Sequence, residues 1–260
     1  MAKGGWAKFP HADKAYDYDG AALKKNWGRL HRGDCEPFPD AAALQAAWRL
    51  YHRGDFGAAI EAGVAAGTAG YNVANKAAAI YATYLEKSDA KRLKLLEEAA
   101  ARAEQAMDAH PKSANAHYYH ALALGRYSQG ISVAAALKQG LAGKVRKSLE
   151  RALALAPKHA DAHIALGTWH AEIINKVGAL VGGMTYGAKK EAAIDHFKQA
   201  LRLNPDSAIG RIEYANALVM LFGDARMAEA EQLYAEAAKC KPADAMERLD
   251  VELARAELED

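Results

Sequence analysis

Residues 163–205 read HIALGTWHAEIINKVGALVGGMTYGAKKEAAIDHFKQALRLNP, and this stretch decides the fold. It ends in Pro205, which Ala193, Phe197 and Ala200 precede by 12, 8 and 5 residues. These intervals place the three side chains on one face of a helix, because residues three and four apart are neighbours on a helical surface. Proline then ends the helix, since the residue before it is disfavoured in the α conformation.

The same spacing recurs before three other prolines. Counting back 12, 8 and 5 residues gives Ala99, Ala103 and Ala106 before Pro111, Val145, Leu149 and Ala152 before Pro157, and Ala230, Tyr234 and Ala237 before Pro242. The small side chains let a neighbouring helix approach, and the larger one fills the gap between helices. A second helix is predicted after each of the first three prolines, with Ser113 and Ser207 as N-cap candidates. Each unit is therefore a helix, a turn, a second helix and a proline.

Composition supports a chain that is nearly all α-helix. Hydrophobic residues make up 51% of the 260 positions and charged residues 25%. Alanine, the best helix former, dominates the apolar set, whereas β-branched residues are sparse. We predict an all-α superhelix of about five helix-turn-helix units with elongated central helices. Residues 40–242 form the array, residues 1–39 an N-terminal arm with a short helix at Leu23, Trp27 and Leu30, and residues 243–260 a C-terminal capping helix.

Two units carry extra residues. The distances between successive prolines are 46, 48 and 37 residues, whereas a standard tetratricopeptide repeat has about 34. The additional residues fall at 127–144 and 173–190 and include several glycines. They predict either longer helices or loops that bulge from the same edge of two neighbouring repeats.

The repeats resemble the tetratricopeptide family. Its signature is W-x2-L-G-x2-Y, then A-x3-F, then P, and residues 163–205 match it with His163 and His170 in place of the Trp and Tyr. Residues 43–66 form an earlier unit, in which Gly54-Asp55-Phe56 is similar to the turn between the two helices of that repeat.

A narrower resemblance rests on three short stretches. The residues Ala116-His117-Tyr118-Tyr119 and Leu149-Glu150-Arg151-Ala152-Leu153, together with Trp169-His170-Ala171-Glu172, are similar to the regulator of microtubule dynamics family. A weaker similarity links the chain to the T-component proteins of TRAP transporters. The first resemblance implies a tetratricopeptide domain that binds and transfers phospholipids at membrane contacts. Eukaryotic members usually carry an N-terminal membrane anchor, and residues 1–18 contain no apolar run that could serve as one.

Charge is unevenly distributed although the net value is only +2. Residues 111–158 hold eight Lys or Arg and one acid, whereas residues 224–260 hold eleven acids and five bases. Within the basic part, Lys144, Lys147 and Arg151 share a helix face, which suits a phosphate or carboxylate or a solvated outer surface. The basic excess and the exposed aromatics that nucleic-acid binding requires are both absent.

The sequence also predicts where the protein resides. Cys35 and Cys240 are the two cysteines, and neither lies in a disulfide or redox motif, which suits a reducing compartment. No signal peptide and no transmembrane segment is predicted. A cytoplasmic protein is expected, with peripheral membrane contact as an option.

Several chemical motifs can be excluded. His117, His120, His159, His163 and His170 have one-face helical spacings, but no cysteine is near and no H-E-x-x-H occurs, so packing or ligand lining is favoured over metal binding. The glycine-rich residues 177–187 lack both the Lys-Ser/Thr ending and the preceding strand of a phosphate-binding loop. They form either a surface loop or a mobile apolar lid over a groove. No catalytic grouping appears, and we expect no enzyme activity, no cofactor and no metal.

The favoured function is binding of an amphipathic small molecule, such as a phospholipid or acyl compound with an anionic head, in a concave groove. The alternative is a scaffold that binds a peptide or protein partner, for which Asn115, Asn175 and Asn216 are candidate contacts. The predicted ligand-binding residues are Tyr118, Tyr119, Arg126, Lys144, Arg146, Trp169, Glu172, Asn175 and Met184.

Overall fold

The computed structural model describes residues 5–259, and every regular element in that range is helical. In chain order the α-helices are α1 (Gly20–Leu30), α2 (Ala42–His52), α3 (Phe56–Ala65), α4 (Tyr71–Tyr84), α5 (Asp89–Ala109), α6 (Ala114–Gln129), α7 (Val133–Lys138), α8 (Leu141–Leu155), α9 (Ala160–Val177), α10 (Ala179–Val181), α11 (Lys190–Leu203), α12 (Ala208–Phe222), α13 (Met227–Ala237) and α14 (Ala245–Glu259). Three 3-10 segments, η1 (Lys14–Tyr16), η2 (Gly67–Gly70) and η4 (Gly223–Arg226), and a π-helical turn, η3 (Gly182–Tyr186), complete the set.

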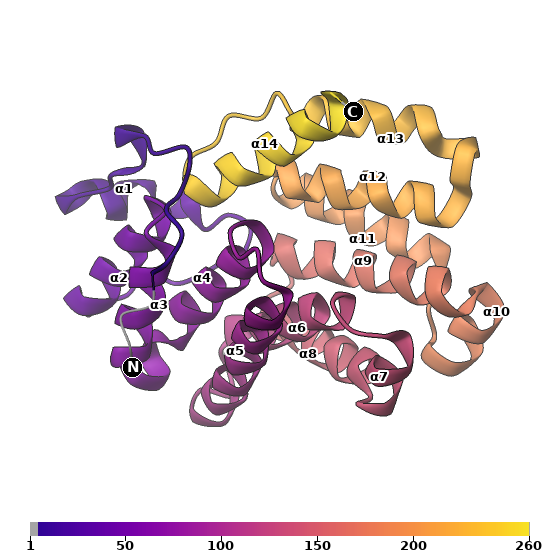
Figure 1. Ribbon diagram of the computed structural model, residues 1–260, viewed down its shortest axis with the longest axis horizontal. Helices are drawn as coiled ribbons and strands as arrows, with labels where there is room; N and C mark the ends of the chain where they lie inside the picture. Colours follow the sequence, from indigo (N-terminus) through magenta and orange to yellow (C-terminus); the bar gives the residue numbers. More distant parts are fainter. Residues whose placement is uncertain (1–4, 260) are drawn as a thin grey trace.

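Within the described residues, ten helices form five consecutive pairs, which are α2–α3, α4–α5, α6–α8, α9–α11 and α12–α13. The first helices of neighbouring pairs also contact one another and form the inner layer of a curved array. Figure 1 shows the pairs following one another around a curve from α2 to α13. The predicted all-α superhelix of about five units is confirmed.

Three of the four prolines in the spacing pattern lie two residues after the end of a helix. Helices α5, α8 and α11 each end two residues before their proline, at Ala109, Leu155 and Leu203. Three of the four central positions, Ala103, Leu149 and Phe197, are 0% exposed, whereas Tyr234 is half-buried. The pattern therefore marks the faces that hold each pair of helices together.

Serine N-caps begin helices α6 and α12, as predicted. The Ser113 hydroxyl accepts a hydrogen bond from the Ala116 amide at 3.2 Å, and the Ser207 hydroxyl accepts one from the Gly210 amide at 3.0 Å. Each bond satisfies an amide that has no partner within the first turn of its helix. Gly54, in the turn before α3, has a φ of 94°, a conformation that glycine adopts without strain.

The two insertions fold into short helices. Residues between α6 and α8 form α7, and residues between α9 and α11 form α10 and η3. Helix α9 also extends to 18 residues. Part of the inserted sequence thus lengthens a helix, and the rest forms connecting segments that contain short helices.

The C-terminal helix differs from the sequence expectation. Helical spacing in residues 243–258 predicts that Met246, Leu249, Leu253 and Ala256 share the packed side. In α14, however, Ala256 is exposed, whereas Val251 and Ala254 are 0% exposed. Helix α14 starts beside the N-terminal helices and ends beside α13 (Figure 1). It is therefore packed on two sides and closes the open edge of the curve, which a helical-wheel reading for a one-sided cap could not anticipate.

The N-terminal arm is folded onto the inner layer. Helix α1 buries Leu23, Trp27 and Leu30, as predicted. The chain then turns across the concave side as residues 31–36, which we call the strap. The first four residues of the predicted arm lie outside the described part of the chain.

Candidate functional site

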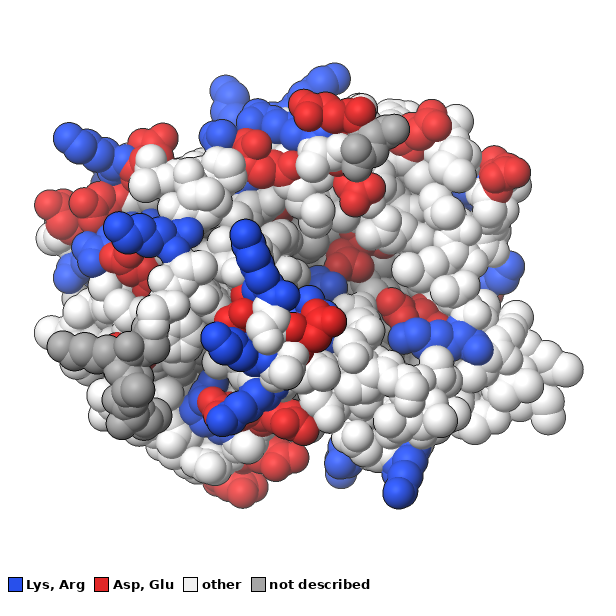
Figure 2. All heavy atoms as spheres, in the orientation of Figure 1, with Lys and Arg blue, Asp and Glu red and all other residues white. Residues whose placement is uncertain are grey.

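A cavity of ≈ 210 Å³ lies on the concave side of the array. The inner helices α4, α6, α9 and α12 form its walls, α7 and α8 form one end, and α14 with the strap closes the other. Figure 2 shows a hollow in the middle of this face, with acidic and basic atoms in its depth. The cavity exists because the ring of helices is closed by α14 and the strap.

Much of the cavity wall is apolar. The side chains that provide this surface include Ile80, Leu122, Leu141, Val145, Ile164, Ala165, Trp169, Ile173 and Ile209. Trp169 donates its indole N–H to the Ala142 carbonyl at 2.9 Å. That bond satisfies the indole nitrogen, so the ring can serve as an apolar wall.

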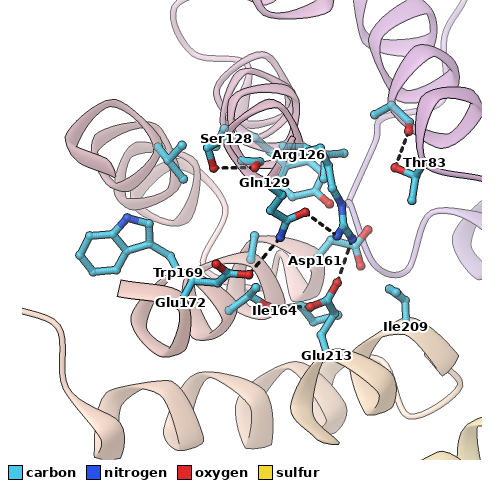
Figure 3. Close-up of a pocket in the computed structure, with 18 of the residues that line it drawn as sticks. Thr83, Arg126, Ser128, Gln129, Asp161, Ile164, Trp169, Glu172, Ile209 and Glu213 are labelled. Carbon is cyan, nitrogen blue, oxygen red and sulfur yellow. Dashed lines mark hydrogen bonds and ion pairs between the residues drawn. The ribbon is translucent and has the colours of Figure 1, made fainter. Parts of the chain in front are cut away.

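One polar network crosses the cavity between α6, α9 and α12 (Figure 3). The Arg126 guanidinium donates to Glu213 Oε1 at 2.8 Å and to Gln129 Oε1 at 3.2 Å. Gln129 in turn donates to Glu172 at 3.3 Å, and Lys176 pairs with the same carboxylate at 2.6 Å. Burial alone would lower the pKa of Arg126, but the charge and hydrogen bond of Glu213, together with Tyr84 and Tyr118, outweigh it and the net pKa is raised. Arg126 is thus a paired cation.

The strap inserts a carboxylate into the base of the cavity. Asp34 accepts from Lys76 Nζ at 2.6 Å and from the Tyr119 hydroxyl at 2.8 Å, and it lies 2.9 Å from His31 Nδ1. Burial raises the pKa of Asp34, but the charges and hydrogen bonds of Lys76 and His31 together outweigh that effect and hold the pKa well below its usual range. Asp34 and Lys76 therefore form a buried ion pair that ties the strap to α4.

The strap also forms hydrogen bonds with two asparagines of the inner layer. The Glu36 carboxylate accepts from Asn72 at 3.0 Å and from Asn115 at 2.5 Å. The Gly33 carbonyl accepts from the Asp161 amide at 3.0 Å. A side chain at Gly33 would meet the Asp161 carboxyl, since a Cβ there would lie 2.3 Å from Oδ1. The strap thus fills part of the concave face, with residues 31–34 in a turn.

Helix α14 contributes a second set of carboxyl groups. Asp250 accepts from the Tyr84 hydroxyl at 2.5 Å, and Asp244 lies 2.8 Å from His52 Nδ1. Glu247 pairs with Arg29 of α1 at 2.5 Å. These contacts join the last helix to the N-terminal helices and hold the ring closed.

Five of the nine predicted ligand-binding residues line the cavity, namely Tyr118, Tyr119, Arg126, Trp169 and Glu172. The other four do not. Lys144 and Asn175 are exposed on the outside, and Met184 is 82% exposed. Arg146 pairs with Glu150 at 2.7 Å, donates to the Tyr186 carbonyl and lies over the outer side of the cavity wall against Trp169. The structure therefore separates the basic stripe of α8 from the cavity.

Sequence reasoning missed the buried charges of the site, which are Asp34, Lys76, Asp161, Glu213 and Asp250. One signal was available. Lys76 stands in the run Val-Ala-Asn-Lys-Ala-Ala-Ala-Ile, where a lone lysine among small apolar residues indicates a buried and paired cation. The acids carried no such signal because their neighbours come from distant helices.

The histidines named from the sequence do not line the cavity, whereas Val177 and Tyr186 of the glycine-rich segment do. His163 Nδ1 and His196 Nδ1 are 2.9 Å apart, so one ring donates to the other. Between residues 5 and 259 the structure places no three His, Cys, Asp or Glu side chains where they could share a metal ion. Residues 178–187 form α10 and η3, and the lid interpretation of this segment stays a prediction.

Buried carboxyls determine how stability depends on pH above 6.5. Burial raises the pKa of Glu36 and Asp161 to about 7 and that of Asp250 to about 8. Carboxyls of the unfolded chain titrate near pH 4, so the folded protein holds more protons from about pH 4 to 8 and loses stability as pH rises through that window. Burial lowers the pKa of His31 and His159 to about 4. These two histidines make stability increase as pH rises, but only below about pH 6.5, where the unfolded histidines are protonated.

We therefore expect the free energy of unfolding to fall between pH 6.5 and pH 8.5, by up to ~1.4 kcal/mol per pH unit for each titrating carboxyl. Urea unfolding at three pH values in this range measures it. Asp250→Asn should flatten the profile, whereas Glu97→Gln, at an exposed position, should leave it unchanged. A free energy that stays constant or rises over the range would contradict the expectation.

Comparison with known proteins agrees with this architecture. The sequence profile of the family described as Regulator of microtubule dynamics protein 1-3 matches residues 69–259. The chain belongs to that family. No curated protein sequence matches it significantly.

One solved structure shares the helical-repeat fold of this chain. The crystal structure of TTC0263, a thermophilic tetratricopeptide-repeat protein of Thermus thermophilus, is similar with a TM-score of 0.57 and 19% identity, over 82% of this chain and 97% of its own. A monomeric mutant of IFIT1 with Gppp-AAAA is similar over 85% of this chain and 56% of its own, at 15% identity and a TM-score of 0.43. Across residues 5–259, no helix of this family member is both long and apolar enough to span a bilayer.

Proposed function

We propose that the protein is a non-catalytic binding protein that holds the apolar part of an amphipathic small molecule in its central cavity. The observation that carries this proposal is the cavity itself, which is bounded by α4, α6, α9 and α12 and lined largely by aliphatic and aromatic side chains. Concave, mostly apolar sites with a few polar groups are typical of small-molecule binding. The membership in the microtubule-dynamics family and the tetratricopeptide fold are compatible with it.

An exposed apolar lip beside the cavity supports the same function. Val133 and Leu137 of α7 line the cavity and are also 44% and 48% exposed. Leu180 and Met184, in α10 and η3, are 76% and 82% exposed. The surface over α7 and α10, at the lower right of Figure 2, is largely free of charged side chains. Such a lip offers an apolar chain a route into the cavity and suits peripheral contact with a lipid surface.

A peptide or protein scaffold is the second candidate. Asparagines on the inner face of the array motivated it, and Asn115 does bind a carboxylate. That carboxylate belongs to Glu36 of the strap, however, so an external peptide would have to displace part of the chain. The occupied groove favours the cavity as the binding site.

A cavity-filling variant tests the proposal. A Cβ at Gly125, which lines the cavity from α6, would meet no atom within 4 Å, so Gly125→Phe would fill the cavity without disturbing the fold. We expect isothermal titration calorimetry to show binding of 1-decanol to the unaltered protein and at least tenfold weaker binding to the variant.

Gly143→Phe is the matched control. Gly143 lies in α8, is exposed and also has open space at its Cβ position, but it does not line the cavity. It should bind decanol like the unaltered protein, and both variants should unfold at unchanged or higher urea concentration because glycine destabilises helix interiors. Equal binding by Gly125→Phe would show that the apolar chain lies elsewhere.

A further inference from the structure

The cavity lining carries more acids than bases. Six acids line it, namely Asp34, Asp161, Glu172, Glu213, Glu247 and Asp250, against three bases, Lys76, Arg126 and Lys176. Each base is already paired, Lys76 with Asp34, Arg126 with Glu213 and Lys176 with Glu172. Glu247 takes its cation from α1, where Arg29 pairs with it. An anionic head group would thus find no free cation among the described residues that line this cavity.

Two carboxyls of the lining, Asp161 and Asp250, form no ion pair among residues 5–259, although the charge of Lys76 acts on the half-buried Asp161. Asp161 lies in the first turn of α9, and its side chain makes neither a hydrogen bond nor an ion pair within that range. Asp250, on α14, is 2% exposed and accepts one hydrogen bond, from the Tyr84 hydroxyl to Oδ1. Its second oxygen receives no hydrogen bond from the described part of the chain.

The cost of an unpaired charge restricts which ligand groups can lie next to Asp161 and Asp250. An ionised carboxylate without a cation in a protein interior costs several kcal/mol, so each group takes up a proton or receives a cation from outside. Asp161 and Asp250 line the same cavity, so a cation that enters this cavity lowers the cost of either charge. Tyr84, Tyr118 and Trp169 line the same cavity, and aromatic ring faces attract ammonium groups.

We propose that the cavity takes an organic amine, whose ammonium group is held by Asp161 and Asp250 while its apolar chain lies along α6 and α9. This amine proposal rests on the proposed function and specifies in addition that the head group of the ligand is positively charged. The head group is opposite in charge to the anionic one expected from the sequence. The reason is that Lys144, Lys147 and Arg151, which motivated that expectation, are exposed on the outer face of α8.

A matched series of decyl compounds tests the charge. Calorimetric titrations at pH 8 compare 1-decylamine, 1-decanol and decanoate, which share one chain and differ in the head group. We expect decylamine to bind at least tenfold more tightly than decanol and at least a hundredfold more tightly than decanoate. Ethylamine, which has the charge without the chain, should bind at least tenfold more weakly than decylamine.

Two isosteric variants assign the binding to its residues. Asp161→Asn and Asp250→Asn should each weaken decylamine binding at least tenfold while decanol binding changes less than threefold. Glu97→Gln, on the exposed face of α5, should bind all compounds like the unaltered protein. Circular dichroism and the retained decanol binding report that the variants fold.

The outcomes separate the two proposals. If decanol and decanoate bind as tightly as decylamine, or if both aspartate variants keep full decylamine affinity, the amine assignment is wrong and the apolar cavity function stands. If ethylamine binds as tightly as decylamine, the chain is not held and the assignment fails as well. If none of the decyl compounds binds, the proposed function itself fails.

Discussion

Replacement of Lys76 by methionine is expected to lower the free energy of unfolding by about 3–5 kcal/mol. The Lys76 side chain is 5% exposed and lies 2.6 Å from Asp34, whose side chain is 0% exposed. Methionine fills a similar volume but removes the ammonium that neutralises Asp34. The carboxylate would then stay buried with only the His31 ring and the Tyr119 hydroxyl as side-chain partners among the described residues.

Urea unfolding monitored by circular dichroism measures the loss, and a second substitution identifies its cause. Adding Asp34→Asn to Lys76→Met should recover at least about 1 kcal/mol, because the amide carries no charge that needs a partner. Lys87→Met, at an exposed position, should change stability by less than ~0.5 kcal/mol. If Lys76→Met unfolds at the same urea concentration as the unaltered protein, the strap is not anchored by this pair.

Truncation of Phe197 to alanine is expected to destabilise the fourth helix pair by about 3–5 kcal/mol. The ring is 0% exposed and lies parallel to Tyr214, with 5.2 Å between ring centroids. It packs directly over Gly167, where a Cβ would approach the ring to 2.8 Å. Alanine at 197 would leave a cavity between α9, α11 and α12 that rigid helices cannot fill by collapse.

The same urea measurement tests this expectation, with Leu258→Ala as the control. Leu258 is 48% exposed near the end of α14, so its truncation should have an effect within ~0.5 kcal/mol. A loss of less than about 1 kcal/mol for Phe197→Ala, well below the usual cost of truncating a buried ring, would show that the proline-based spacing does not mark the packed positions of the repeat.

The repeats were readable from the sequence because they are local. The small residue five positions before a proline and the residue eight positions before it lie in one helix, which ends just before that proline. Their spacing therefore predicts the packed face of the helix without knowledge of distant contacts. Phe197 and Leu149 were identified in this way and are fully buried. Tyr118, Tyr119, Arg126, Trp169 and Glu172 were predicted from the two glycine-bearing insertions beside a basic helix and from the family resemblance, and they do line the cavity.

Other residues of the site could not be found by local pattern. Lys144 and Arg146 are close in sequence to α7, whose residues line the cavity, but their side chains leave the opposite face of α8. Helix periodicity says which residues share a face and leaves open which face points inward. That choice depends on the neighbouring helices.

The sequence by itself determined the all-helical repeat, its five units and the ends of their helices. Only the tertiary structure decided that the array closes into a ring, because closure depends on pairs such as Tyr84–Asp250 and Lys76–Asp34, which lie 166 and 42 residues apart. Such pairs leave no periodic trace in the chain. The charge inside the cavity is set by these long-range contacts, and it is the basis on which we propose a cationic rather than an anionic head group.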